Sequence, residues 1–186
     1  MDCSFYTKIG ACRHGDRCAR RHPRPSHSNT VLLANMFVPL DGIPLPPTAG
    51  GPPVQPRPLK PQHSAEDVRH FDMFFHDVFC ELAKYGELKR LIVCENEGLH
   101  LVGNVYAVFR NEADAVVAAE SLNNRYYGGR PLFAELSPMI EFRDACCRQH
   151  DMDGCDRGGQ CNFLHVRRPT VELENELYRA QDMTMR

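Results

Sequence analysis

The stretch CSFYTKIGACRHGDRCARRH, residues 3–22, places Cys3, Cys12, Cys18 and His22 at spacings of eight, five and three residues. Three thiolates and one imidazole form a soft set of four ligands, which suits tetrahedral Zn²⁺. The stretch has too few apolar residues to bury a core of its own. Its folding would therefore come from metal binding, worth on the order of 10 kcal/mol or more. We predict a CCCH zinc finger here.

A second set of the same kind lies near the other end of the chain. Cys147, Cys155, Cys161 and His165 are separated by seven, five and three residues, so the Cys-x₅-Cys-x₃-His pattern occurs twice. Cys146 offers the alternative first spacing of eight residues and leaves the first ligand open. We favour Cys147, because the glycine-containing segments before the second ligand of each set then resemble one another. The chain is predicted to hold two structural zinc ions.

Two other readings of the cysteines are weaker. The chain has nine cysteines, and only Cys80 and Cys94 lie outside the two clusters. Disulfide bonds would not explain a histidine four residues after the last cysteine in both clusters. A catalytic zinc site needs an open coordination position, which four protein ligands do not leave. We therefore expect both metals to be structural.

Charge is unevenly distributed along the chain, whose formal net charge is −2. Residues 1–30 carry six basic and two acidic side chains, whereas residues 64–137 carry seven basic and twelve acidic ones. This asymmetry predicts two partners of opposite charge. No apolar run approaches the roughly 18 residues of a membrane span. The N-terminus also lacks the basic and apolar regions of a secretory signal. We expect no membrane partner.

The middle of the chain has the pattern strand, helix, strand, strand, helix, strand. The clearest helix has apolar residues at three- and four-residue spacing, and Ser64 followed by Asp67 is a capping signal. The expected elements are strands 30–36, 88–93, 102–109 and 131–136 and helices 64–82 and 111–123. This βαββαβ order predicts an α+β, RRM-like fold, a four-stranded antiparallel sheet with both helices on one face.

The remaining segments complete the expected organisation. Residues 39–63 contain nine prolines and are predicted to be an extended or disordered insertion, with a peptide ligand for a partner module as an alternative. A short helix is expected at 171–178. The predicted domains are a CCCH zinc finger at 1–28, the RRM-like domain at 29–138, a second finger at 139–168 and a C-terminal helix and tail at 169–186.

RNA binding is expected from the fingers rather than the sheet. Each finger combines aromatic residues with arginines, which can stack on unpaired bases and contact phosphates, although one aromatic per finger can also merely cover the metal. On the third strand, Gly103, Tyr106 and Phe109 fit the RNA-binding consensus of this fold, but Val102 and Asn104 do not. Tyr106 and Phe109 are therefore expected in the core or beneath the C-terminal segment.

Five stretches together resemble the small-subunit family of the U2 snRNP auxiliary factor (U2AF), which recognises 3′ splice sites. They are CSFYTKIGACRHGDRC (3–18), HLVGNVY (100–106), AELSP (134–138), FRDACCRQ (142–149) and CNFLH (161–165). The resemblance implies that the central domain is of the U2AF-homology type. Such a domain binds a tryptophan-bearing peptide of the large subunit to form a heterodimer.

The resemblance also implies which residues hold that peptide. The motif that grips the tryptophan reads Arg125-Tyr126-Tyr127 here, where relatives have Trp and Phe in place of the two tyrosines. A tyrosine can still pack on an indole. An ordinary solvated helix face is the alternative for the acidic residues. The candidate partner-binding residues are Glu66, Asp67, Asp72, Asp77, Glu81, Arg125, Tyr126 and Tyr127.

For RNA, the resemblance implies that both fingers together read the AG dinucleotide at the 3′ end of the intron. The first and last strands of the sheet are neighbours in this family, so the fingers should emerge side by side. Ala19 stands where relatives often have Ser, which removes a hydroxyl contact. The candidate RNA-binding residues are Phe5, Arg13, Arg20, Arg148 and Phe163.

The resulting expectation is a nuclear, non-enzymatic pre-mRNA splicing factor that binds single-stranded RNA and the large subunit. One alternative is a CCCH-type mRNA stability or decay factor that binds AU-rich RNA, although such factors usually carry their fingers in tandem. A scaffold made rigid by zinc is a third reading. An enzyme has the least support, because the sequence has no phosphate loop, nucleophile–base pair or open metal site.

Overall fold

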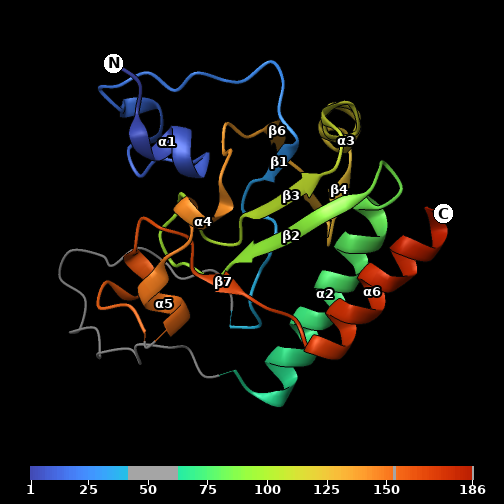
Figure 1. The fold of residues 1–186 in the computed structure, drawn as a ribbon. Coiled ribbons are helices and arrows are strands. Elements are labelled where there is room, and N and C mark those ends of the chain that lie inside the picture. Colours follow the sequence, from blue (N-terminus) through green and yellow to red (C-terminus); the bar gives the residue numbers. More distant parts are fainter. Residues whose placement is uncertain (42–62, 153, 186) are drawn as a thin grey trace.

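A computed structural model describes residues 1–41, 63–152 and 154–185 of the chain (Figure 1). Most of the predicted proline-rich insertion, 39–63, lies outside the described residues. Five strands form one antiparallel sheet in the order β6-β1-β3-β2-β7. Their bounds are Thr30–Leu33 for β1, Leu88–Cys94 for β2, Val105–Phe109 for β3, Ala134–Leu136 for β6 and Val166–Arg167 for β7.

The predicted α+β, RRM-like architecture is confirmed, with one addition. Strands β6, β1, β3 and β2 have the expected neighbours, and helices α2 (Ala65–Leu82) and α3 (Glu112–Leu122) pack on the same face of the sheet. The addition is β7, which follows the second finger and pairs with the end of β2, Val93 opposite Arg167. A segment of the second finger is therefore part of the sheet itself.

Helix α2 forms where the sequence predicts it, because its capping residues and its regularly spaced apolar residues both make the expected contacts. The Ser64 hydroxyl accepts a hydrogen bond from the Asp67 amide at 3.1 Å, and the Asp67 carboxylate accepts one from the Ser64 amide at 3.1 Å. This capping box satisfies two amides at the helix start. Phe71, Phe75 and Val78 are among its buried residues and face the sheet.

Two predicted strands are shorter than expected. Strand 102–109 begins only at Val105, because Gly103 turns the chain with φ +63. A Cβ on Gly103 would lie 2.1 Å from the backbone oxygen of Phe37, so this position needs glycine. The predicted first strand likewise ends at Leu33, and Asn35 follows with φ +50.

The predicted last strand, 131–136, is wrong as a single element. Its first residue belongs to a hairpin in which β4 (Tyr126–Tyr127) pairs with β5 (Arg130–Pro131), and only β6 joins the sheet. The cause is the Gly128-Gly129 turn, with φ values of +55 and +76, which suits a two-residue hairpin loop. The sequence pattern did not reveal strands of only two residues.

The C-terminal helix α6 (Val171–Thr184) extends six residues beyond the predicted end at 178. It lies along the outer side of β2 (Figure 1). The Gln181 side chain accepts a hydrogen bond from the Leu88 amide at 2.8 Å and donates one to the Leu88 carbonyl at 3.0 Å. The Tyr178 hydroxyl accepts one from the Leu91 amide at 3.0 Å. The helix thus satisfies backbone groups that an edge strand leaves free.

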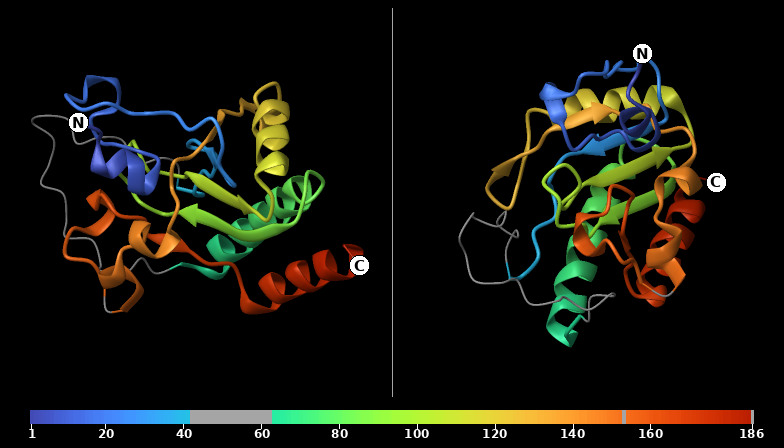
Figure 2. Two further views of the ribbon diagram at one scale, coloured as in Figure 1. Left: turned by 45° about the horizontal axis from the view of Figure 1, so that its top comes forward. Right: turned by 90° about the vertical axis from the view of Figure 1, so that its left-hand side faces the viewer.

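Short helices make up much of the two fingers. They are α1 (Ser4–Ile9) and the 3₁₀ turn Gly15–Arg17 in the first, and α4 (Phe142–Ala145), α5 (Arg148–Met152) and the 3₁₀ turn Gly158–Gln160 in the second. Figure 2 shows both fingers together, away from α2 and α6. In the part of the chain that the structure describes, no helix is both long and apolar enough to cross a membrane.

The fingers cover the sheet face opposite α2 and α3. Tyr106 is fully buried there, in a cluster with Ile9 of the first finger and Leu164 of the second. Phe109 is also fully buried, but on the helix-covered face. The expectation that neither aromatic is free to stack on a base is therefore confirmed.

Candidate functional site

The first finger brings its four predicted ligands together. One ligand atom from each of Cys3, Cys12, Cys18 and His22 lies within 4.8 Å of the others. The Cys3 amide donates to the Arg21 carbonyl at 2.9 Å, which ties the two ends of the finger together. Burial raises the pKa of the Cys3 thiol, but hydrogen bonds from the Tyr6 backbone and from His22 outweigh it. The resulting pKa is about 7, which favours the thiolate that binds metal.

The second finger places Cys147, not Cys146, with Cys155, Cys161 and His165, again within 4.8 Å. The backbone gives an independent reason for this choice. In the first finger Asp2 bridges to Arg21, and in the second Cys146 bridges to Leu164. In each case the residue before the first ligand bridges to the residue before the histidine. Cys147 is therefore the counterpart of Cys3.

Cys146 sits in different surroundings. It is half-buried, and burial raises the pKa of its thiol to about 12. Such a thiol stays protonated at neutral pH and is a poor metal ligand. The two neighbouring cysteines therefore differ in chemistry as well as in position.

Three residues around the second finger support its ligands. Arg157 directs Nε at the Cys161 Sγ, 3.2 Å away, and Nη2 at the Cys147 Sγ, 3.8 Å away, so its charge offsets the negative charge of the thiolates. The His150 ring stacks on the His165 ring at 4.0 Å between centroids. His150 Nε2 lies 2.9 Å from a Glu95 carboxylate oxygen. The sequence pattern did not single out these supports, because their spacing from the ligands follows no metal-binding motif.

The donor sets fit zinc. Burial, with the charge of His150, lowers the pKa of His165 to about 4, so its imidazole is neutral, as a metal ligand must be. The buried Nε2 atoms of His22 and His165 have no hydrogen-bond partner among the described residues. A bound cation would satisfy both atoms. Two structural Zn²⁺ ions, each held by three thiolates and one imidazole, account for both clusters.

The two fingers contact one another, as predicted. Strands β1 and β6 are antiparallel neighbours, so the chain leaves the start of β1 and the end of β6 at the same end of the sheet. The Phe5 ring then meets the Phe163 ring edge-on, with centroids 6.2 Å apart and planes inclined at 63°. Phe5 remains 39% exposed. This aromatic pair joins the fingers into one surface.

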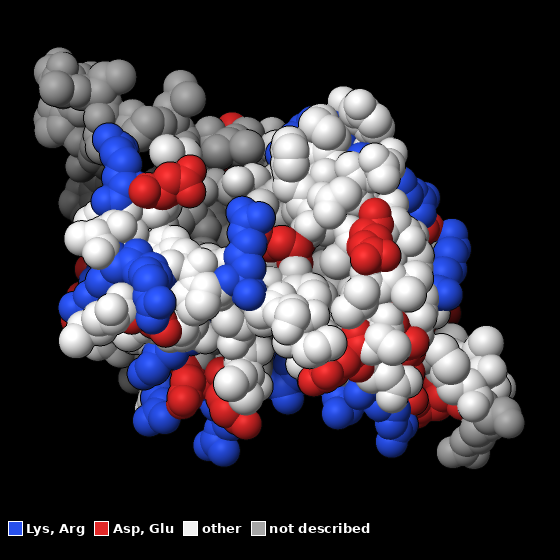
Figure 3. Space-filling view, turned by 90° about the horizontal axis from the view of Figure 1, so that it is seen from above, with Lys and Arg blue, Asp and Glu red and all other residues white. Residues whose placement is uncertain are grey.

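The three candidate arginines lie close to zinc ligands in the sequence. Arg13 follows the ligand Cys12, Arg20 precedes His22, and Arg148 opens α5; all three side chains are exposed. Figure 3 shows basic and acidic side chains interspersed, with the basic ones more frequent on the left, where the first finger lies. No hydrogen bond or ion pair holds these three arginines among the described residues, so each is free to contact a ligand.

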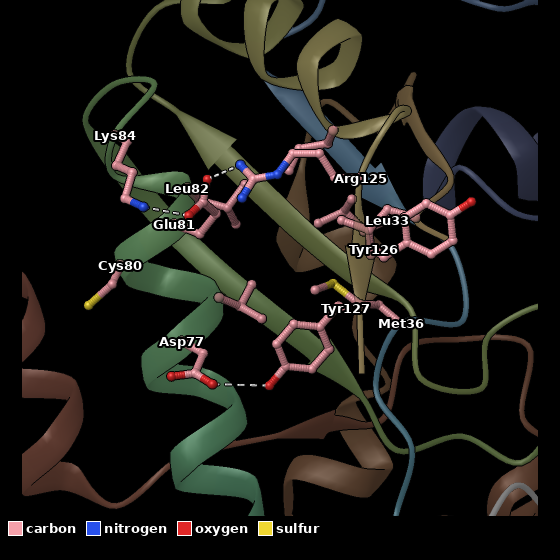
Figure 4. Close-up of a pocket in the computed structure, with 13 residues that line it drawn as sticks. Leu33, Met36, Asp77, Cys80, Glu81, Leu82, Lys84, Arg125, Tyr126 and Tyr127 are labelled. Atoms are coloured by element: carbon pink, nitrogen blue, oxygen red, sulfur yellow. Dashed lines mark hydrogen bonds and ion pairs between the residues drawn. The ribbon is translucent and has the colours of Figure 1, made fainter. Parts of the chain in front are cut away.

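A second candidate site lies on the helix-covered side of the sheet (Figure 4). It is a pocket of about 320 Å³ between α2, the end of β1 and the β4–β5 hairpin. Arg125 forms an ion pair with Glu81 and lies 3.2 Å from the Tyr85 hydroxyl. The Tyr127 hydroxyl donates to Asp77 at 3.3 Å, whereas the Tyr126 ring points away and is 71% exposed. Glu81 also pairs with Lys84 at 2.6 Å.

The remaining predicted partner residues do not line the pocket. Asp67 belongs to the capping box, and Asp72 accepts hydrogen bonds from the Thr170 amide and hydroxyl at 3.0 and 2.8 Å. Glu66 is exposed in the first turn of α2. Sequence reasoning missed the apolar wall, whose residues come from five separate elements or loops and share no local motif. They are Leu33, Met36, Val78, Leu82, Leu122 and Leu132.

Comparisons with known proteins agree with these features. Residues 2–24 match the zinc finger family of the C-x8-C-x5-C-x3-H type (and similar). The chain is 46% identical to the splicing factor U2AF 23 kDa subunit of Schizosaccharomyces pombe, covering 97% of this chain and 78% of that protein. It is 51% identical to the splicing factor U2af 38 kDa subunit of Drosophila melanogaster, covering 96% of this chain and 66% of that protein.

Two further comparisons concern a third relative and a solved structure. The splicing factor U2AF 26 kDa subunit of Bos taurus is 47% identical over 96% of this chain and 78% of its own length. A solved structure, the Rna15 RRM with bound RNA (GU), covers 59% of this chain and 83% of its own, with 16% identity and a TM-score of 0.32. The fold assignment therefore rests on the strand order of this chain. From the identity over nearly its whole length and from its two Cys₃His clusters, the chain belongs to the U2AF small-subunit family of splicing factors.

Proposed function

We propose that this protein acts in the nucleus as a pre-mRNA splicing factor whose two zinc fingers together bind the AG dinucleotide of a 3′ splice site. The contact between Phe5 and Phe163 carries the proposal, because it makes one surface of two fingers that are far apart in the sequence. The relatives are named as splicing factors, which supports the same function.

The composition of this surface supports single-stranded RNA as its ligand. Base stacking on an aromatic side chain contributes roughly 1–3 kcal/mol per base. Phe5 and Phe163 offer such faces, and Arg13, Arg20 and Arg148 add positive charge for phosphates and base edges. The buried Tyr106 is not accessible for stacking, so the fingers take over the role that the sheet has in other RRM-like domains.

The pocket of Figure 4 supports the second half of the proposal, heterodimerisation through a peptide of the large U2AF subunit. Its apolar wall and volume of about 320 Å³ suit an indole ring. Arg125 is held across its rim by Glu81 and can lie against the face of a bound tryptophan. The carboxylates of Asp77 and Glu81 would attract basic residues beside the tryptophan.

RNA binding by the zinc-loaded chain, in the presence of the tryptophan-bearing peptide, tests the first half. The probes are a short RNA ending in UUAG and the same RNA ending in UUCG or UUAC. We expect clear loss of affinity for both altered probes. Equal binding to all three would contradict AG recognition, and preference for an AU-rich probe would favour an mRNA stability factor instead.

Calorimetric titration of the peptide, without RNA, tests the second half independently. We expect one peptide per chain and loss of binding when its tryptophan is replaced by alanine. Unchanged binding of the alanine peptide would contradict the assignment of the pocket. The RNA result does not depend on this outcome, because the two sites lie on different sides of the sheet.

A further inference from the structure

We infer that a basic groove beside the second finger binds the phosphate backbone of the RNA strand that flanks the dinucleotide held by the fingers. The inference extends the proposed function and rests on it. The groove has a volume of about 380 Å³ and lies outside the pocket and the finger surface described above. It is bounded by β2, α4, the segment around β7, and α6. Figure 1 shows β7 at the end of β2.

Three exposed cationic side chains, Lys89, Arg90 and Arg168, line this groove. Lys89 has no hydrogen-bond or ion-pair partner among the described residues. Arg168 has only a distant one, Asp151 at 4.0 Å, in a solvent-exposed pair that contributes little. One acidic side chain, Glu174, lines the groove as well. The groove is therefore positive, in a chain whose formal net charge is −2.

A backbone irregularity brings two of these cations, Lys89 and Arg90, to the same side of β2. Strand β2 changes register between Leu88 and Arg90 in its pairing with β3. Such a bulge adds a residue to one strand and turns its side chain to a new direction. Arg90 then lies over the Phe142 ring, 4.7 Å from its centroid, and this contact holds its guanidinium at the groove wall. A positioned guanidinium can bind a phosphate or stack on a base.

Protection of the sheet edge does not explain the charges. Edge strands often carry lysine to prevent pairing with another chain. Here the Leu88 amide and carbonyl are already bonded to Gln181, and the Leu91 amide to Tyr178. Because these main-chain groups are occupied, addition of a peptide strand is disfavoured as well. The groove would therefore bind a ligand through its charged side chains and not through its main chain.

The position of the groove beside the second finger favours RNA as its ligand. Arg168 reaches toward Asp151 of α5, and the same five-residue helix begins with the candidate RNA-binding residue Arg148. The strand β7 borders the groove and directly follows the zinc ligand His165, although the guanidinium of its Arg167 lies over the Phe71 ring in the core. An RNA strand leaving the second finger would thus meet the groove without crossing another part of the fold.

The test compares a short RNA, UUAG, with the same RNA extended by about ten uridines on its 5′ or its 3′ side, a length within the range of a single-stranded site. The variants are Lys89→Gln/Arg90→Gln in the full zinc-loaded chain, with Arg69→Gln on α2 as control. We expect one extended probe to bind wild type more tightly than UUAG does. The double variant should lose this gain and keep its affinity for UUAG.

Salt dependence gives a second readout. The slope of log K against log salt should become less negative by about 0.7 for each phosphate contact that the double variant loses. Glu174→Gln removes the acidic wall and should strengthen binding of the extended probe, a gain that misfolding would not produce. Equal gains from extension in wild type and double variant would overturn the inference, as would no gain in wild type.

Two further outcomes separate this inference from the proposed function. Loss of AG discrimination with retained dependence on Lys89 and Arg90 would refute the proposed function and leave the groove as a general RNA site. A poly-glutamate peptide that binds with dependence on Lys89 and Arg90, while extension of the RNA has no effect, would instead identify an acidic protein as the occupant and contradict the inference.

Discussion

The ring of Phe5 lies edge-on against the ring of Phe163, with the centroids 6.2 Å apart, and this pair connects the two zinc fingers. An edge-to-face aromatic pair contributes about 0.5–1.5 kcal/mol beyond its buried area. We predict that Phe5→Ala and Phe163→Ala each weaken binding of the UUAG probe by roughly 1–3 kcal/mol, the value of one stacked base.

A double-mutant cycle separates the two roles of this pair. If the fingers read RNA as one surface, the two losses should not be additive, and the coupling energy should be at least about 0.5 kcal/mol. Additive losses would mean that each finger binds independently. Zinc content, measured on both variants, should stay at two ions per chain, which controls for loss of a finger.

The two adjacent cysteines of the second finger offer a matched comparison. Cys147→Ala removes a ligand, whereas Cys146→Ala removes a half-buried thiol that lies outside the ligand set. We predict that zinc content falls from two ions to one in the first variant and stays at two in the second. Elemental analysis of the purified proteins measures this directly. Equal zinc loss in both variants would contradict the assignment of Cys147.

Zinc loss at this finger should also loosen the sheet. The His165 amide donates to Asn96 at 2.8 Å, and the Glu95 amide donates to the His165 carbonyl at 2.9 Å. We therefore expect faster amide exchange at the end of β2 in Cys147→Ala. Cys18→Ala in the first finger is the comparison and should change this exchange less, because no hydrogen bond among the described residues joins that finger to the end of β2.

The proposed role of the pocket beside α2 can be tested at Tyr127, the tyrosine expected to replace the phenylalanine of relatives. Tyr127→Phe keeps the ring in its edge contact with Phe74, 5.5 Å between centroids, and removes only the hydroxyl bonded to Asp77. We predict unchanged or slightly stronger peptide binding, since the Asp77 carboxylate loses a hydrogen bond that competes with the peptide. Arg125→Ala should weaken binding by roughly 0.5–2 kcal/mol, the value of a cation–π contact. Stronger loss in Tyr127→Phe than in Arg125→Ala would reverse this assignment.

Two glycines with positive φ separate steric clash from backbone strain. Gly103 has φ +63 and no room for a Cβ beside the Phe37 oxygen, whereas Gly128 has φ +55 and nothing within 4 Å of that position. Gly128→Ala should cost about 1 kcal/mol of unfolding free energy from strain alone. Gly103→Ala should cost more than about 2 kcal/mol, because the clash with backbone adds to the strain. Chemical denaturation of both variants provides the comparison.

The buried Gln181 is predicted to stabilise the sheet edge. Gln181→Ala leaves the Leu88 amide and carbonyl without partners in a buried place, which costs roughly 1–3 kcal/mol. Glu176→Ala, on an exposed position of the same helix, should change stability by less than about 0.5 kcal/mol. Equal unfolding midpoints for the two variants would show that α6 does not hold β2 through this side chain.

The sequence was most informative where a local signal and the final contacts agree. The ligand spacings located both metal sites, because four soft ligands at short separations have few other uses. The Ser64 and Asp67 signal located the start of α2, since capping depends on residues close in the chain. The choice of Cys147 over Cys146 needed the structure, in which the paired bridges of the two fingers settle it.

Other features depend on tertiary contacts that no local pattern records. Strand β7 is two residues long and exists only because β2 lies beside it. Helix α6 continues past 178 through a polar stretch, and the burial of Gln181 there has no sequence signature. The contact of the Arg157 guanidinium with two zinc-ligand sulfurs likewise follows from no metal-binding spacing. The acidic residues of α2 also differ in role. Asp67 caps the helix and Asp72 binds Thr170, whereas Asp77 and Glu81 line the pocket.

The neighbouring positions of β1 and β6 have a consequence for the timing of activity during synthesis. The first finger emerges from the ribosome early. The second finger, which it contacts, follows only after β6 has been synthesised. A nascent chain that stops before Phe163 therefore holds one complete metal site and one ring of the aromatic pair. If the two fingers read RNA together as proposed, they can do so only once translation has passed the last zinc ligand.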